Sequence, residues 1–258
     1  MNKFMIPEER QALILKKLNM NRFVQVSELA KEFQVTTVTI RQDLDKMEAD
    51  GLCIRKHGGA LKVNPGVTTE TPYYIKRHEM TSEKERIALE ALKLIGDGDT
   101  FILDAGSTTY ALALLLNNKA QITVVTNDLK IAVKLAENPK FKLVCTGGIA
   151  RNFVYSLQGS IAEHVINEIN VDKTFIGADA IHQNGVISNV NVEEVQLKKA
   201  MIAAADQLIL LADSSKFTKS GFYKVCDIDQ VDLVITDNGI SKESRELLES
   251  RGVKYIVT

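Results

Sequence analysis

The chain has 258 residues, of which 45% are hydrophobic and 25% are charged, enough for a small domain and a larger one with a sizeable core. Three scattered cysteines and four histidines, with no Cys-x-x-Cys pair, argue against a disulfide framework or a zinc site, and we expect no metal and no cofactor. Because the N-terminus lacks signal-peptide features and no long apolar run follows, we expect a cytoplasmic protein outside the membrane.

Charge is distributed unevenly along the chain. The net charge is −1, yet residues 1–62 carry 11 Lys and Arg against 8 Asp and Glu, a net of +3 that leaves −4 for the rest. The asymmetry is modest. It fits a small nucleic-acid-binding module joined to an acidic domain.

Two short helices are expected before residue 35. Residues 8–19 carry apolar side chains at helical spacing, and residues 27–33 do the same after Ser27, a plausible N-cap. The break at Gln34-Val35 has the length of the turn in a helix-turn-helix, whose second helix enters the major groove of DNA.

A third helix is expected to run from Thr36 or Thr37, either of which can cap it, to a left-handed stop at Gly51. Its buried side is marked by Ile40, Leu44 and Met47. The opposite side remains available to a partner and carries Val38, Arg41, Gln42 and Asp45.

A basic two-stranded wing is predicted after this helix. Leu52 and Ile54 flank Cys53 as a short strand, and Arg55-Lys56-His57 precede a Gly58-Gly59 turn. The alternative is a plain three-helix bundle with a solvated face. We favour DNA binding because a charged helix face, a threonine-rich helix start and a basic wing coincide. The candidate DNA contacts are Thr36, Thr37, Val38, Thr39, Arg41, Gln42, Arg55, Lys56 and His57.

The segment from Val35 to Leu44, followed by Gly51, Arg55 and His57-Gly58-Gly59-Ala60, resembles the winged helix of the DeoR family of sugar-responsive repressors. Two positions depart from the family pattern. Thr36 stands where serine is usual and keeps the capping hydroxyl, whereas Gln42 replaces an arginine and suits a bidentate contact with adenine. The resemblance therefore implies DNA binding but leaves the operator sequence open.

A linker is expected after the wing. Residues 61–79 contain Asn64-Pro65-Gly66, a threonine cluster and Pro72, a composition that disfavours regular structure. Ser82 and Glu85 form a candidate capping box for the helix that follows. We therefore predict a DNA-binding domain over residues 1–62, a linker over 63–80 and a second domain over 81–258.

The second domain alternates short apolar runs with helical patterns, which predicts an α/β domain with a mainly parallel sheet covered on both faces. The predicted strands are Phe101 to Leu103, Ile122 to Val125, Lys142 to Cys145, Thr174 to Ile176, Leu208 to Ala212, Leu233 to Ile235 and Tyr255 to Val257. Ligands of such sheets bind at the carboxyl ends of the strands. The Gly106-Ser107-Thr108-Thr109 turn, followed by a helix start, is a good phosphate seat.

Ordinary explanations stand beside each of these features. Ser107 and Thr108 can simply cap a helix, the glycines can simply make turns, and Glu194 with Lys198 can be an i,i+4 ion pair. Several polar loops at the carboxyl ends of the strands, on one rim of the sheet, together favour a ligand pocket. The candidate effector-binding residues are Asp104, Gly106, Ser107, Thr108, Thr109, Thr126, Asn127, Gly147, Gly148, Asp179, Glu194, Lys198, Asp213 and Lys216.

The DeoR resemblance continues through this half, in motifs such as Asp104 to Thr109 and Asp213 to Phe217. It implies a sensor domain that is similar to ribose-5-phosphate isomerase and CoA transferases, binds a phosphorylated sugar and releases operator DNA in response. Double-stranded operator DNA and a homodimer or homotetramer are implied as well, and hexitol or amino-sugar phosphates are the favoured effectors.

The rival hypothesis is a sugar-phosphate isomerase. That enzyme places its acids in an Asp-Gly-Ala-Asp-Glu stretch, whereas Ile176 to Ala180 of this chain keeps only Asp179. We therefore expect a binding domain and not an enzyme.

Overall fold

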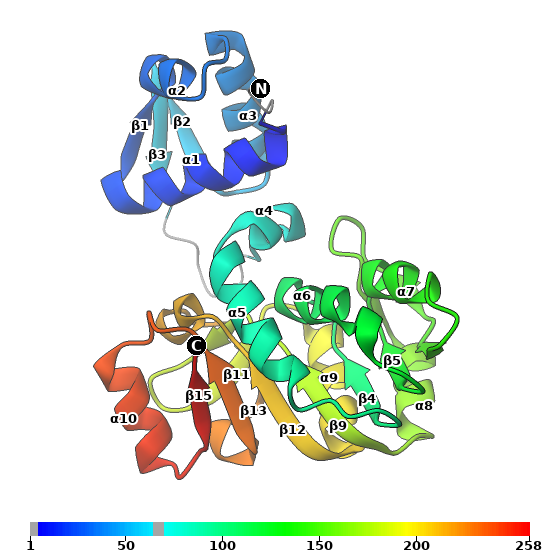
Figure 1. Ribbon diagram of the computed structural model, residues 1–258. Coiled ribbons are helices and arrows are strands. Elements are labelled where there is room, and N and C mark those ends of the chain that lie inside the picture. Colours follow the sequence, from blue (N-terminus) through cyan, green and yellow to red (C-terminus); the bar gives the residue numbers. More distant parts are fainter. Residues whose placement is uncertain (1–4, 64–69) are drawn as a thin grey trace. The chain divides into compact units, whose positions relative to one another are not determined.

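The computed structural model describes residues 5–63 and 70–258, without the side chain of Thr218 (Figure 1). The chain divides into two compact units, Met1–Glu79 and Met80–Thr258. The second unit thus begins one residue before the start expected for the second domain. Asn64-Pro65-Gly66, part of the expected linker, lies outside the described residues.

The first unit is a winged helix. Its three strands form an antiparallel sheet in the order β1-β3-β2. Ile14, Ile40, Leu44 and Met47 are fully buried in its core, which confirms the apolar periodicities of the helices. The elements are α1 (Pro7–Asn21), β1 (Phe23–Gln25), α2 (Val26–Glu32), α3 (Thr37–Ala49), β2 (Cys53–Lys56), β3 (Gly59–Lys62) and α4 (Tyr73–His78).

Two sequence-based expectations for this unit are wrong. Ser27 does not cap α2, because β1 leads directly into the helix, Gln25 holds the N-cap position and Ser27 already lies in the first turn. The expectation of irregular structure over residues 61–79 also fails at residues 61–62 and 73–78. Lys62 ends β3, and α4 forms after Pro72 because proline is tolerated at a helix start and Ile75 finds a buried place in the core.

The second unit is built on a parallel sheet whose order is β15-β14-β12-β9-β4-β5-β6. Every neighbouring pair in this sheet is parallel. All of the predicted apolar runs become strands of this sheet, which confirms the predicted α/β class. The strands are β4 (Thr100–Leu103), β5 (Thr123–Thr126), β6 (Lys142–Cys145), β9 (Val171–Ile176), β12 (Ala205–Leu211), β14 (Leu233–Thr236) and β15 (Tyr255–Val257).

Helices cover both faces of the sheet (Figure 1). Phe101 and Leu103 of β4 pack with α5, α6 and α7, whereas Ile102, pointing to the opposite face, packs with α8 and α9. The helices and 3₁₀ turns are α5 (Thr81–Leu92), α6 (Ser107–Leu115), η1 (Leu116–Asn118), α7 (Leu129–Ala136), α8 (Ser160–Asn167), α9 (Val192–Ala203), η2 (Ser214–Thr218), η3 (Ile228–Gln230) and α10 (Lys242–Ser250).

The expected capping box at Ser82 and Glu85 is not formed. An N-cap residue needs an extended backbone so that its hydroxyl can reach the N–H three residues on, but Ser82 is already helical, and Met80 occupies the N-cap position with φ 52°. The Ser82 hydroxyl donates instead to Glu83.

Shorter antiparallel elements that the sequence did not predict accompany the main sheet. One small sheet is formed by β10 (Ala180–Ile181), β11 (Val186–Asn189) and β13 (Tyr223–Asp227). A hairpin pairs β7 (Ile149–Ala150) with β8 (Leu157–Gln158). Within residues 5–63 and 70–258, none of the helices combines the length and apolarity that crossing a membrane requires.

Candidate functional site

The start of α3 is capped as predicted. Thr36 has an extended backbone, and its hydroxyl oxygen accepts from the Thr39 N–H at 3.1 Å. Val38 is 57% exposed, and Arg41 and Gln42 are exposed beside it. These side chains project from a helix whose other side is fully buried, so α3 presents an exposed face with polar side chains and one apolar one, of the kind that reads DNA.

A buried ion pair holds α3 against α1. Arg10 donates from Nε to Asp43 Oδ2 at 2.5 Å and from Nη2 to Asp43 Oδ1 at 3.2 Å, and Gln11 donates to the same Oδ1 at 2.9 Å. Arg10 and Asp43 are each 4% exposed. A bidentate pair of this kind fixes direction as well as distance, so it sets the angle at which α3 is presented.

The wing residues divide into two groups. Arg55 is half-buried and donates to Asp45 of α3 at 2.9 Å, while its backbone N–H donates to Glu48 at 2.6 Å. Lys56 and His57 are exposed. Arg55 thus connects the wing to α3, whereas Lys56 and His57 lie on the surface.

The two glycines of the wing turn are needed for different reasons. Gly58 has φ +80°, a conformation that other residues rarely adopt. A Cβ on Gly59 would lie 2.1 Å from the carbonyl oxygen of Val24, because β3 passes close to β1 there. The turn and the strand pairing therefore both depend on the Gly-Gly pair.

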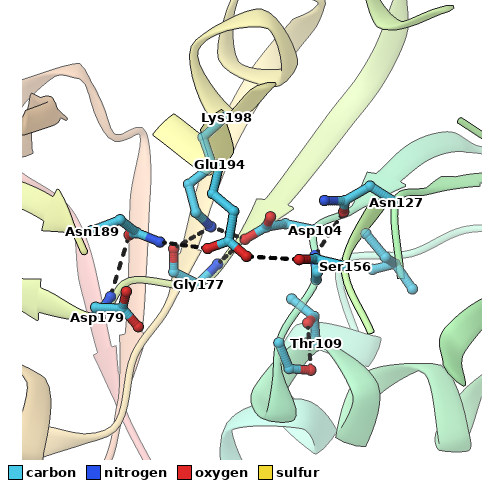
Figure 2. A network of polar contacts seen from close by, with 12 residues as sticks. Asp104, Thr109, Asn127, Ser156, Gly177, Asp179, Asn189, Glu194 and Lys198 are labelled. Carbon is cyan, nitrogen blue, oxygen red and sulfur yellow. Dashed lines mark hydrogen bonds and ion pairs between the residues drawn. The ribbon is translucent and has the colours of Figure 1, made fainter. Parts of the chain in front are cut away.

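In the second unit, a polar network gathers at the carboxyl ends of β4, β5 and β9 (Figure 2). Asp104 is 2% exposed, pairs with Lys198 of α9 and accepts from the Gly177 N–H at 3.0 Å. Lys198 also donates to the Gly177 carbonyl oxygen at 3.0 Å. Asp104 and Lys198 thus stabilise the carboxyl ends of β4 and β9, and their charges neutralise one another.

Thr126 and Asn127 also support the rim. The Thr126 hydroxyl donates to the Leu103 carbonyl oxygen at 2.7 Å. Asn127 accepts from the Ala105 N–H at 2.8 Å, and both side chains are buried. These residues hold the end of β4 in place where the chain turns into α6.

The loop that begins α6 carries the candidate phosphate seat. Thr109 is fully buried and donates to the Gly106 carbonyl oxygen at 3.0 Å, whereas Ser107 is half-buried. No side chain caps this helix at Gly106, and first-turn N–H groups have no partner within their own helix. The backbone of Ser107 and Thr108 therefore offers donors and a positive helix end to an anion.

Asp128 lies next to this seat and was not among the predicted residues. Its Oδ1 accepts from the N–H groups of Lys130 and Ile131, at 2.7 and 3.1 Å, and so caps α7. Burial raises the pKa of Asp128 to about 6, a shift that N–H groups including that of Gly106 partly oppose. The sequence signal for it was an Asp directly before a helical pattern.

The expected alternative of an ion pair along α9 is wrong. Glu194 is 9% exposed; its Oε1 accepts from Arg151 and, at 2.8 Å, from the Ser156 hydroxyl, and Asn189 donates to its Oε2 at 3.5 Å (Figure 2). Each of the two side chains pairs with a residue of another element: Glu194 with Arg151, and Lys198 with Asp104. Arg151 and Ser156 belong to the hairpin segment and were missed because nothing local marks them.

Asp179 follows β9 and the Gly147-Gly148 pair follows β6, two strands that β4 and β5 separate in the sheet. Asp179 Oδ2 accepts from the Val190 N–H at 3.2 Å. Gly148 has φ +106°, and a Cβ there would lie 2.5 Å from the Gln158 carbonyl oxygen, whereas Gly147 has more room. Gly148 is thus required by the close approach of the hairpin segment, whatever else it contacts.

Asp213, at the end of β12, lies among lysines. Its Oδ1 accepts from the Ser215 N–H at 3.1 Å. Burial alone would raise the pKa of Asp213, but the positive charges of Lys216, Lys84 and Lys219 and the hydrogen bond from the Ser215 side chain together outweigh it, and the net shift is downward. Lys84 comes from α5 and is only 4% exposed. Its sequence signal was a lysine on the apolar face that Ile87 and Ala88 define.

Comparison with protein families matches both units. Residues 10–65 match the DeoR-like helix-turn-helix domain, and residues 79–238 match the DeoR C terminal sensor domain. The chain is 36% identical to the uncharacterized helix-turn-helix-type transcriptional regulator YulB of Bacillus subtilis, across 97% of this chain and 96% of that protein.

Two further relatives have more specific names. The chain is 34% identical to a putative aga operon transcriptional repressor of Escherichia coli O157:H7, across 96% of this chain and 93% of that protein. It is 31% identical to the glycerol-3-phosphate regulon repressor of Escherichia coli K12, across 89% and 90%. Its likeness to ribose 5-phosphate isomerase from Methanocaldococcus jannaschii, at 20% identity and a TM-score of 0.41 over 54% of this chain and 55% of that one, is too low to bear on function.

Proposed function

Because this chain belongs to the DeoR family of transcriptional regulators, we propose that it represses an operon for the use of a sugar, sugar alcohol or amino sugar, and that a phosphorylated sugar relieves the repression. The names of two relatives, an aga operon repressor and a glycerol-3-phosphate regulon repressor, support this class of target. A regulator of this kind acts on chromosomal DNA in the cytoplasm.

The DNA-reading surface of the proposal is the exposed face of α3 together with the wing. Arg41 and Gln42 reach base edges in the major groove, with Gln42 suited to adenine. Lys56 and His57 contact backbone phosphates. Two or four copies of the chain present paired helices to the half-sites of an operator, so the spacing between copies determines affinity.

The effector seat of the proposal is the start of α6. Backbone N–H groups and hydroxyls of Ser107 and Thr108 donate to the phosphate, and Lys216 and Lys84 supply positive charge from the end of β12 and from α5. Asp179 and Glu194 face the sugar hydroxyls. The observation that carries the proposal is that the uncapped start of α6 follows β4, while half-buried Lys216 and buried Lys84 surround Asp213 after β12 of the same parallel sheet.

The enzyme alternative is weakened by the state of the carboxylates. An isomerase needs a carboxylate that can take and return a proton beside the substrate carbonyl. Asp104 is paired with Lys198, and Glu194 is paired with Arg151 and also accepts from Ser156. We therefore infer binding without turnover. Detectable interconversion of pentose or hexose phosphates would overturn that inference.

A thermal-shift panel with glycerol 3-phosphate, glucosamine 6-phosphate and hexitol phosphates identifies the effector, because ligands that bind the native state stabilise it. Arg41→Ala is expected to weaken operator binding about tenfold and leave the thermal shift intact. Lys216→Ala is expected to do the reverse.

Matched controls keep these results specific. Lys16→Ala removes one positive charge from an exposed position of α1, and Lys242→Ala removes one from an exposed position of α10. If Arg41→Ala and Lys216→Ala each lose both activities in equal measure, the two sites are not separable as proposed.

A further inference from the structure

Helix α4 is an integral part of the first unit. Ile75 is fully buried in the same core as Ile14 and Leu18, and α4 packs on α1. The two family matches cover residues 10–65 and 79–238, so α4 falls between them. The helix therefore adds to the winged helix a packed element that neither match includes.

Tyr74 of α4 holds the end of α3. Its hydroxyl donates to Asp50 Oδ2 at 2.5 Å, and Lys46 Nζ lies 4.3 Å from the centre of its ring. Lys46 is in the last turn of α3 and Asp50 is its C-cap residue, whose N–H donates to the Lys46 carbonyl oxygen at 3.0 Å. Tyr74 thus contacts both Lys46 and Asp50, at the C-terminal end of α3, the helix that carries the proposed DNA-reading face.

The connection from α4 to the second unit is very short. Helix α4 ends at His78 and α5 begins at Thr81, so Glu79 and Met80 alone separate them. Met80 has φ 52°, a left-handed backbone that non-glycine residues seldom adopt. Three residues into α5 stands Lys84, whose charge acts on Asp213 at the effector rim. Two helices and a two-residue junction therefore separate Tyr74 from the rim.

We propose that Tyr74 is a positioning residue for DNA recognition and that the short α4–α5 connection carries the effector signal to α3. The second part rests on the proposed function. Effector binding at the rim shifts α5 through Lys84, and α4 passes the shift to the clamped end of α3. A long linker rich in glycine and serine would absorb such a shift, and the connection formed by Glu79 and Met80 is neither long nor rich in those residues.

The positioning role is tested in the full chain by operator binding. Tyr74→Ala removes the ring and the hydroxyl and is expected to lower operator affinity about three- to tenfold. Tyr74→Phe keeps the ring beneath Lys46 but lacks the hydrogen bond to Asp50, so it is expected to restore only part of that loss. Amide hydrogen exchange should quicken in the last turn of α3 in the alanine variant and not at Thr37 to Ile40. Unchanged operator affinity in folded Tyr74→Ala overturns the role.

Asp50→Ala gives a second measure that does not touch the core. Removing a negative charge near DNA should, by electrostatics alone, strengthen operator binding. Loss of the oxygen that accepts from the Tyr74 hydroxyl should weaken operator binding instead. Weaker binding of the Asp50→Ala variant therefore supports the positioning role, and stronger binding counts against it.

The link is tested by inserting Gly-Ser-Gly between Glu79 and Met80. Because each unit has its own core, both should keep their folds. The ligand used is the phosphate of the panel that stabilises the wild type most. The insertion variant is expected to bind operator and this phosphate with affinities within about twofold of the wild type. It is expected to lose more than half of the phosphate-induced release of operator DNA. Full release in the insertion variant overturns the link. If no panel phosphate acts on the wild type, the proposed effector class fails, while the Tyr74 and Asp50 measurements still decide the positioning role.

Discussion

Lys198, in the middle of α9, pairs with Asp104 at the end of β4, 94 residues away in the sequence, and their side chains are only 4% and 3% exposed. The pair also holds both backbone groups of Gly177, whose N–H donates to Asp104 and whose carbonyl oxygen accepts from Lys198. A helix and the ends of two strands are thereby joined at the rim where the effector is proposed to bind.

Removing one partner of this pair should be strongly destabilising. Lys198→Met leaves the Asp104 carboxylate buried without its cation, which costs about 3–5 kcal/mol in such sites. We expect the denaturation midpoint of the second unit, followed by circular dichroism, to fall accordingly, and adding Asp104→Leu to recover part of the loss. As a control, Lys242→Met removes an exposed ion pair with Glu246 and should change little. Equal effects of the two lysine substitutions would contradict the assignment.

The Arg10 and Asp43 pair predicts a defect confined to the first unit. Arg10→Met leaves Asp43 with Gln11 as its remaining side-chain partner and is expected to cost about 3–5 kcal/mol of unfolding free energy. Operator binding should be lost with it, whereas the thermal shift caused by a sugar phosphate should persist. Normal operator affinity in this variant would show that the pair does not set the position of α3.

Asp128 predicts a pH dependence of stability. Because its pKa in the folded protein is raised from 3.8 to about 6, the native state holds the proton more tightly than the unfolded chain does. Stability from this group is therefore present below about pH 4 and is lost as pH rises through 6, by at most about 3 kcal/mol. Asp128→Asn keeps a capping oxygen and removes the charge. Its free energy of unfolding, measured with denaturant, should therefore rise relative to that of the wild type between pH 4 and pH 7.

Asp213 is the matched control for that experiment, because its pKa is lowered. Its contribution to stability is present above the ordinary carboxyl pKa and is lost as pH falls. Asp213→Asn should therefore lose stability relative to the wild type as pH rises, opposite to Asp128→Asn. Parallel curves for the two variants would show that their surroundings do not differ as described.

Gly59 predicts a steric failure of the wing. A Cβ at this position would lie 2.1 Å from the Val24 carbonyl oxygen, so Gly59→Ala must separate β3 from β1. We expect loss of operator binding, with the unfolding transition of the second unit unchanged. Gly96→Ala is the control, since the nearest atom to its Cβ would be 3.6 Å away. Normal operator binding by the Gly59→Ala variant would refute the steric argument.

Much of the fold could be predicted from local pattern. The Thr36 cap, the Gly51 stop and the buried side of α3 depend on residues within a few positions of one another. The strands of the parallel sheet are continuous apolar runs, since a sheet covered on both faces requires them. Short elements such as β7 and β8 escaped prediction because two residues carry no period.

Prediction from the sequence was weakest where a residue's role depends on distant neighbours. Ser27 and Ser82 each precede helical patterns, yet neither caps a helix, because the backbone entering each helix is set by the residues before it. Residues 73–78 looked like a linker because they sit beside Pro72, but Ile75 is held by a core formed earlier in the chain.

The order of residues by itself determined that a winged helix precedes an α/β domain, and that polar loops collect at the carboxyl ends of the strands, because these properties follow from short-range periodicity and turn chemistry. Only the tertiary structure decided that Lys198 belongs to Asp104, Glu194 to Arg151 and Tyr74 to the end of α3. Charged and aromatic side chains pair across elements that packing brings together, and the spacing of residues along the chain does not indicate which of them will pair.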